Sequence, residues 1–301
     1  MKIAVLMSSY NGEKYIEEQL DSIIDQNCGH EIDIWVRDDG SRDSTKEILE
    51  RYKEKGLINW YTGENLGPSK SFMDLLIKVK GYDFYSFADQ DDYWMPEKLE
   101  RAVKELSEKK DCQMYFSNAC LVGQDLESLG RNVYRNSPKL DFKTLSCAGG
   151  LLGCTMVIKK ELAEIIQTNP VPDELVLHDF YVSVLCTALG FGICYDERPS
   201  MKYRQHGGNV VGVSSGKLVT LKNRINAVRT KPKHSISEQC HQLLEHYSQQ
   251  ISAENKKWLK KVSEYQNSFL NRLGLAVSAD THYVSINMGM QLRMSILFGN
   301  R

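Results

Sequence analysis

The chain has 301 residues with 38 basic and 39 acidic side chains, so its net charge is only −1. A balanced charge offers no general attraction to polyanions, and we expect no nucleic-acid partner. The hydrophobic content of 42% is that of an ordinary globular protein, and the length is sufficient for one large domain with an appendage. The eight cysteines form no Cys-x-x-Cys pair, which indicates buried thiols and a reducing, cytoplasmic location.

Short apolar runs and helical periodicities alternate through the first 90 residues. Strands are expected at residues 3–7, 32–37 and 58–61, with a fourth ending at Asp89, and helices at 13–26, 44–55 and 69–79. This βαβαβαβ order predicts an α/β fold with a Rossmann-like, mostly parallel sheet flanked by helices. The run at residues 3–7 is too short for a secretory signal, and no apolar stretch is long enough to cross a bilayer.

The second half of the sequence is less regular. Its patterns predict helices at 96–109, 160–167 and 177–189, and strands at 113–120 and 154–158. From about residue 214 the sequence is polar, helix-forming and poor in strand signals. The predicted organisation is one domain over residues 1–214 and a helical C-terminal extension over residues 215–301.

Polar clusters follow three of the predicted strands, at residues 8–12, 38–41 and 89–92. Ligands of such sheets bind beyond the carboxyl ends of the strands, so we expect the three clusters to share a pocket. The last cluster places three carboxylates within four residues, and their repulsion favours a bound divalent cation. A solvated acidic turn is the alternative interpretation.

The order of these motifs resembles the family 2 glycosyltransferases of the GT-A fold, and within them the bacterial rhamnosyltransferase-like enzymes. The motifs that carry the resemblance are Ser8–Tyr15, Arg37–Ser41, Asn65–Pro68, Asp89–Asp92, His178–Asp179 and Tyr203–Asn209. The resemblance implies an inverting transfer from a UDP- or dTDP-sugar, dTDP-rhamnose among the candidates, to a saccharide or lipid-linked acceptor in surface polysaccharide synthesis. The chain lacks the Gln-x-x-Arg-Trp signature of processive synthases, which favours transfer of a single sugar.

The resemblance also implies roles for individual residues. Asp91 would bind Mn²⁺ or Mg²⁺ directly, and Asp89 would contact the ribose or the outer shell of the metal. Asp39 would accept a hydrogen bond from N3–H of a pyrimidine base. The remaining residues expected to bind the donor are Ser8, Tyr10 and Asp38 around the base, and Lys70 and Arg204 near the diphosphate.

Three residues keep two interpretations each. Asp179 matches the position of the catalytic base that deprotonates the acceptor hydroxyl, but it could instead cap the following helix. His206 could complete the metal shell or be structural. Asp92 could orient the acceptor or cap the turn before Trp94.

Two other enzyme or binding classes share part of these patterns. A haloacid-dehalogenase-type phosphatase also has Asp-x-Asp after a strand, although there it follows the first strand. A non-catalytic nucleotide-sugar or glycan-binding module would keep the fold without the base. For the C-terminal helices, the sequence allows either packing as a helical cap or peripheral contact with the inner face of the cell membrane.

Overall fold

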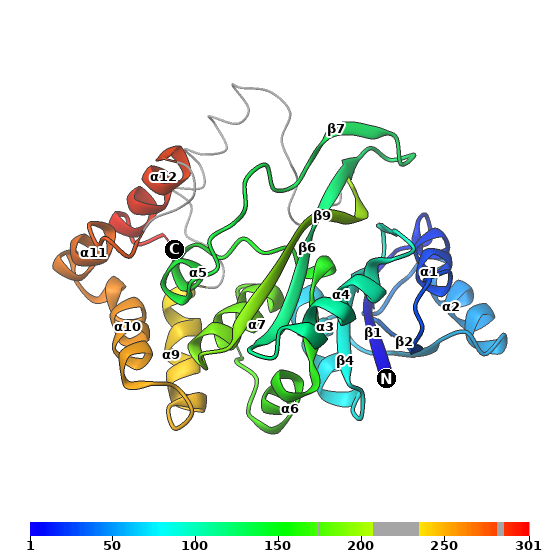
Figure 1. The fold of residues 1–301 in the computed structure, drawn as a ribbon, viewed down its shortest axis with the longest axis horizontal. Coiled ribbons are helices and arrows are strands. Elements are labelled where there is room, and N and C mark those ends of the chain that lie inside the picture. The colour runs from blue at the N-terminus through cyan, green and yellow to red at the C-terminus, as the bar shows by residue number, and fades with distance from the viewer. Residues whose placement is uncertain (174, 207–234, 282–285, 301) are drawn as a thin grey trace. The chain divides into compact units, whose positions relative to one another are not determined.

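The computed structural model describes residues 1–173, 175–206, 235–281 and 286–300 of a chain that divides into two units (Figure 1). The first unit comprises Met1–Arg135, Leu152–Thr168 and Gly192–Gly208, and the second comprises Asn136–Leu151, Asn169–Phe191 and Asn209–Arg301. The division differs from the predicted one, since residues 136–151 and 169–191 group with the C-terminal helices. The predicted boundary at residue 214 lies outside the described residues.

The N-terminal half of the first unit alternates strands and helices, as predicted. Its elements are β1 (Lys2–Ser9), α1 (Ile16–Ile24), β2 (Glu31–Asp38), α2 (Thr45–Glu54), β3 (Asn59–Thr62), α3 (Pro68–Lys78) and β4 (Phe84–Asp89). The four strands are parallel and lie in the order β3-β2-β1-β4. This half of the sheet therefore has the predicted Rossmann-like, parallel arrangement.

The later strands of the first unit make the sheet mixed. Its later elements are β5 (Tyr93–Trp94), α4 (Lys98–Glu108), β6 (Cys112–Val122), β7 (Ser128–Asn132), η1 (Gly153–Thr155), β8 (Val157–Lys159), α6 (Lys160–Thr168) and β9 (Gly192–Arg204). The order continues β4-β8-β6-β9-β5, with β7 also beside β6. Strand β8 is antiparallel to both β4 and β6, whereas β6 and β9 are parallel. The expectation of a mostly parallel sheet thus holds for β1–β4, and the short strand β8 reverses direction beyond them.

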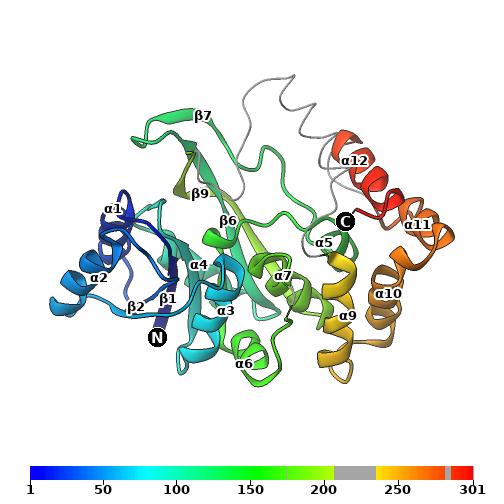
Figure 2. The same ribbon diagram turned by 180° about the vertical axis from the view of Figure 1, so that it is seen from behind.

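Helices cover both faces of this sheet. Helix α4 lies on the face seen in Figure 1, and α3 lies on the face seen in Figure 2. Ile3, Val5 and Met7 of β1 belong to a core shared with α1, α2 and α4, whereas Ala4 and Leu6 point to the opposite face. All five are fully buried. A strand buried on both faces needs apolar residues at every position, which explains the unbroken apolar run.

The second unit is helical. Its elements are α5 (Phe142–Ala148), α7 (His178–Ala188), α9 (Ile236–Tyr247), α10 (Ala253–Ser263), η2 (Tyr265–Asn267), α11 (Phe269–Ala276) and α12 (Ile286–Leu297). The hydroxyls of Tyr181 and Tyr247 lie 2.7 Å apart, and Trp258 Nε1 donates to Ser146 Oγ at 2.8 Å. These buried contacts join α7 to α9 and α5 to α10, which is why residues 136–151 and 169–191 group with the C-terminal helices. Among the described residues, no helix is long and apolar enough to span a bilayer.

Candidate active site

The polar clusters that follow β1, β2 and β4 meet at one edge of the sheet. In the pairing register, Ser9 lies opposite Asp38 of β2, and Ser8 lies opposite Asp89 of β4. Because the three strands are parallel, their carboxyl ends lie side by side. The structure therefore brings together Ser8, Asp38 and Asp89, which are 81 positions apart at their extremes in the sequence.

The loop after β1 is tied to the acidic turn after β4. Tyr10 N–H donates to Gln90 Oε1 at 2.9 Å, and Gln90 Nε2 donates to the carbonyl of Tyr10 at 3.0 Å. A Cβ at Gly12 would lie 2.2 Å from Gln90 Oε1, so a larger residue there would push the end of this side chain away from Tyr10. The Tyr10 side chain is 45% exposed, which leaves its ring open to a planar ligand at this edge.

Asp39 is buried and holds the turn before α3. It forms an ion pair with Arg37 that was not predicted. Its Oδ1 and Oδ2 also accept the backbone N–H groups of Leu66 and Gly67, at 2.9 and 2.8 Å. A carboxylate offers about four acceptor positions. Asp39 is 2% exposed, and these three partners leave it about one acceptor position. The predicted hydrogen bond from N3–H of a base would use that position.

Asp38 and Ser8 also have partners within the protein. Asp38 Oδ1 accepts the backbone N–H of Ser41 at 3.0 Å and the hydroxyl of Thr62 at 3.1 Å, and the side chain is fully buried. Ser8 Oγ donates to Ser71 Oγ at 2.6 Å, which fixes the start of α3 beside the end of β1. Both residues therefore shape this edge of the sheet through buried hydrogen bonds.

Asp91 and His206 lie in direct contact. His206 Nε2 is 2.6 Å from Asp91 Oδ2, and the two side chains are 17% and 18% exposed. The His206 ring also packs on Tyr15, with centroids 5.3 Å apart and planes inclined by 35°. The structure thus joins the two predicted metal ligands, which are 115 residues apart in the chain.

Arg204 differs from its predicted role near the diphosphate. Its side chain is 2% exposed, and its guanidinium donates to the Asp91 carbonyl at 2.7 Å and to the Gln124 carbonyl. It also pairs with Glu18 and lies 4.4 Å from the centroid of the Tyr15 ring. These contacts engage Nε and both terminal nitrogens, so we interpret Arg204 as a positioning residue for the acidic turn, and its contact with the diphosphate stays a prediction.

The acidic turn rests on a buried group of ionisable side chains. Ligand atoms of Asp89, Asp92 and Cys154 lie within 4.8 Å of one another, and Asp92 is fully buried. Burial raises the pKa of the Asp92 carboxyl well above its ordinary value, and its acidic neighbours add to the rise. Lys98 is also fully buried, with Nζ 4.3 Å from the centroid of the Trp94 ring, and burial lowers its pKa to about 7. Interactions with Cys154 and Asp92 oppose this lowering of the Lys98 pKa but are smaller than the effect of burial.

Two further predicted residues lie in the first turns of helices. Lys70 is exposed near the start of α3, where helix N–H groups also favour anions. Asp179 is half-buried in α7 of the second unit, and its Oδ1 accepts the backbone N–H of Phe180 at 2.6 Å. The N-cap residue of α7 is Leu177, and no described side chain caps the helix, so this contact lies within the first turn and is not a helix cap. The catalytic role of Asp179 stays a prediction. Burial lowers the pKa of the adjacent His178 to about 3, so its imidazole is neutral at physiological pH.

The family profile described as Glycosyl transferase family 2 matches residues 4–165, which is more than half of the chain. The chain is a family 2 glycosyltransferase. Among its curated relatives, the dTDP-rhamnosyl transferase RfbG of Shigella flexneri is 34% identical over 241 residues, covering 75% of this chain and 80% of the relative. This family 2 glycosyltransferase is thus rhamnosyltransferase-like in sequence.

Solved structures place the glycosyltransferase in the GT-A fold. S. aureus TarS 1-349 in complex with UDP-GlcNAc has a TM-score of 0.57 at 17% identity, over 99% of this chain and 90% of TarS 1-349. The mannosyltransferase PcManGT from Pyrobaculum calidifontis, in complex with GDP-Man and Mn²⁺, has a TM-score of 0.50 at 15% identity, over 99% and 74% of the two chains. At these identities the likeness shows the fold alone.

Several residues of the glycosyltransferase site were not predicted from the sequence. The sequence predicts a helix over residues 96–109 but gives Lys98 no role, and neither Cys154 nor Arg37 was assigned one. The signal for Lys98 is its spacing of four residues from Ala102, on the apolar face that also carries Leu99. A lysine beside such a stripe reads as exposed unless its buried partners are known.

Proposed function

We propose that this glycosyltransferase is metal-dependent and inverting, and that it moves one sugar from a UDP- or dTDP-sugar to a saccharide or lipid-linked acceptor in surface polysaccharide synthesis. The relationship to a dTDP-rhamnosyl transferase makes dTDP-rhamnose the first donor to test. The likeness to TarS in complex with UDP-GlcNAc supports a pyrimidine nucleotide donor. The observation that carries the proposal is the contact between Asp91 and His206 at the edge where the polar clusters meet.

The side chains at the acidic turn fit a divalent cation. Asp91 offers a carboxylate oxygen, His206 offers an imidazole nitrogen, and Asp89 lies at the carboxyl end of β4 in the same turn. Carboxylates with one imidazole suit Mn²⁺, and a carboxylate set suits Mg²⁺. When bound, the cation neutralises negative charge on the diphosphate leaving group. PcManGT, which shares the fold, holds Mn²⁺ together with its GDP-Man donor.

The protein groups have separate tasks in the proposed reaction. Tyr10 stacks on the base, Asp39 accepts its N3–H, and Lys70 attracts the diphosphate at the start of α3. Asp179 removes the proton of the acceptor hydroxyl as that oxygen attacks the anomeric carbon. One displacement with one base inverts the anomeric centre. Arg204 contacts no substrate in this scheme and keeps Asp91 in place.

Incubation with Mn²⁺ and a panel of UDP- and dTDP-sugars tests the function. We expect the productive donor to raise the melting temperature and to be hydrolysed slowly without acceptor, because binding to the native state stabilises it. Hydrolysis that stops on chelation and returns with Mn²⁺ would support the metal-dependent transferase. Release of phosphate from simple monoesters would favour the phosphatase instead. A thermal shift with no turnover under any condition would favour the binding module.

We also propose that the second unit contacts the membrane that carries a lipid-linked acceptor. Phe269 and Leu270 of helix α11 are 64% and 76% exposed, and Val277, directly after the helix, is 65% exposed. Met290 of α12 is 58% exposed, and α12 packs against α11. Apolar side chains this exposed favour insertion into the interfacial region of a membrane. The basic residues of α10 would be attracted to anionic lipids.

Co-sedimentation with anionic vesicles tests this contact. We expect the Leu270→Glu variant to pellet several-fold less than the wild type, since a charge on the apolar surface opposes insertion. Leu129→Glu is the matched control, because Leu129 is 43% exposed on β7 of the first unit. Equal pelleting of the wild type and Leu270→Glu would remove the membrane proposal and leave the helices as a cap.

A further inference from the structure

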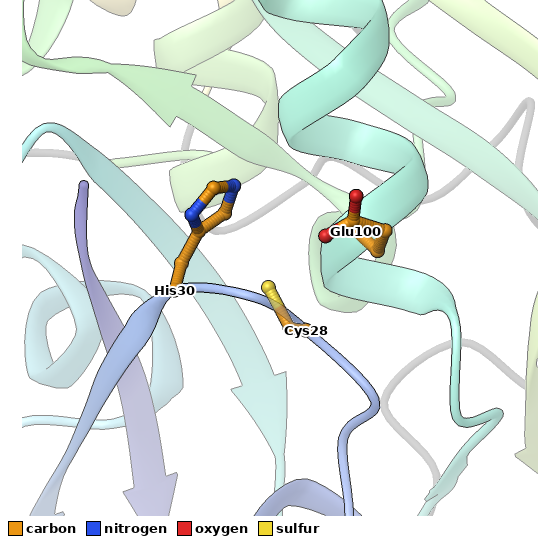
Figure 3. Close-up of side chains that lie close together, drawn as sticks. All are labelled: Cys28, His30 and Glu100. Atoms are coloured by element: carbon orange, nitrogen blue, oxygen red, sulfur yellow. The ribbon is translucent and has the colours of Figure 1, made fainter.

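A second group of metal-binding side chains lies at the opposite end of the strands from the acidic turn. Cys28 and His30 precede β2, which begins at Glu31, and Glu100 lies in the first turn of α4. One ligand atom from each of these three side chains lies within 4.8 Å of the other two. Figure 3 shows the Cys28 sulfur between the His30 ring and the Glu100 carboxylate, with the loop and the helix facing each other.

Hydrogen bonds already hold the loop against the helix. The Gln26 side chain donates to the Met95 carbonyl at 2.8 Å and accepts the Leu99 N–H at 3.1 Å. Asn27 N–H donates to the Pro96 carbonyl at 2.9 Å. These hydrogen bonds fix the backbone on both sides of the site and so position Cys28, His30 and Glu100. A metal ion would therefore not have to order the loop. Pre-organised ligands lose less entropy on binding.

The three donors form a chemically mixed set. A thiolate, an imidazole and a carboxylate are the ligand types that zinc accepts, whereas Mg²⁺ and Ca²⁺ prefer oxygen alone. A bound cation would favour the thiolate form of Cys28 and would be shared with the Glu100 carboxylate.

We propose that Cys28, His30 and Glu100 form a zinc site that is separate from the catalytic edge of the sheet. With three protein ligands, the fourth tetrahedral position is open to water. The ion would cross-link the start of β2 to the first turn of α4. That helix also carries the fully buried Lys98, whose Nζ lies 4.3 Å from the centroid of the Trp94 ring, so the ion would also anchor the helix that follows the acidic turn. None of this depends on the donor or on the reaction.

Zinc binding to the full chain tests the proposal. Zinc is titrated against a chromophoric chelator in excess Mg²⁺, which occupies oxygen-rich sites at the acidic turn. We expect the wild type to retain one zinc ion more per chain than Cys28→Ser or Glu100→Gln, with an affinity loss of at least about 100-fold in each variant. At a hundredfold excess over Kd, zinc should raise the melting temperature of the wild type by about 5 °C.

Cobalt gives a second readout that reports on sulfur ligation. We expect a thiolate-to-cobalt charge-transfer band in the wild type and in Cys120→Ser, whose cysteine has similar partial exposure, but not in Cys28→Ser. Glu100 is exposed, so Glu100→Gln preserves the fold and keeps the test decisive if Cys28→Ser folds poorly. Equal zinc retention by the wild type and Glu100→Gln, or a charge-transfer band that persists in Cys28→Ser, would overturn the proposal.

Discussion

Replacing Asp179 by Asn is expected to lower the turnover of sugar transfer by about 10²–10⁴-fold while the affinity for the donor stays within about twofold. The amide cannot accept the proton of the acceptor hydroxyl. Its oxygen can still accept the Phe180 N–H that Asp179 Oδ1 accepts at 2.6 Å, so the start of α7 should be preserved. The variant therefore tests the base with the local hydrogen bond of Asp179 retained. Steady-state kinetics and donor titration of the purified protein measure the two quantities.

Asp173→Asn is the matched control for this experiment, because Asp173 is an exposed carboxylate in the segment before α7. Its turnover should equal that of the wild type. If Asp179→Asn also turned over at the wild-type rate, Asp179 would not be the base, which would have to be sought elsewhere. An equal loss of donor affinity and turnover would instead assign Asp179 to binding.

Replacing Asp91 by Asn should weaken the metal and the donor together. The substitution removes the charge next to His206 with little change in shape, and we expect the donor Kd in Mn²⁺ to rise by about 10- to 100-fold. In the presence of a chelator, the wild type and the variant should bind the donor equally weakly. The losses of donor affinity caused by the substitution and by chelation are then not additive, which shows that both remove the same interaction, the one made through the metal. Calorimetric titration with and without Mn²⁺ measures all four affinities.

Asp125→Asn controls for a general loss of negative charge, since Asp125 is exposed in the turn that joins β6 to β7. It should leave all four affinities unchanged. Additive effects of Asp91→Asn and chelation would show that Asp91 acts on the donor without the metal, and His206 would then become the first candidate for the principal ligand.

The half of the fold that could be predicted is the half in which local pattern determines the structure. The apolar run at residues 3–7 needs burial on both faces, and the helices between β1 and β4 are long enough to bring successive strands into parallel register. The polar clusters then had to meet at one edge, because parallel strands share a direction. Ser8, Asp38 and Asp89 lie there as expected.

The parts that could not be predicted depend on contacts between distant positions. Arg204 reads as an exposed cation until its partners Glu18 and Asp91 are placed around it. Similarly, no periodicity indicates that Glu100 faces Cys28, which lies 72 positions earlier. The grouping of residues 136–151 and 169–191 with the C-terminal helices likewise depends on tertiary pairs such as Tyr181 and Tyr247. Patterns along a sequence carry little information about such pairs.

The pairing of β6 with β9 affects how the protein folds during its synthesis. About 70 residues separate the end of β6 from the start of β9, and β9 is the strand that fills the gap between β6 and β5. At translation speeds of about 5–20 residues per second, a nascent chain presents an unpaired edge of β6 for several seconds. Such an edge invites strand exchange with neighbouring chains on the same polysome. Yield during expression should therefore depend on chaperone supply more than the stability of the finished fold would indicate.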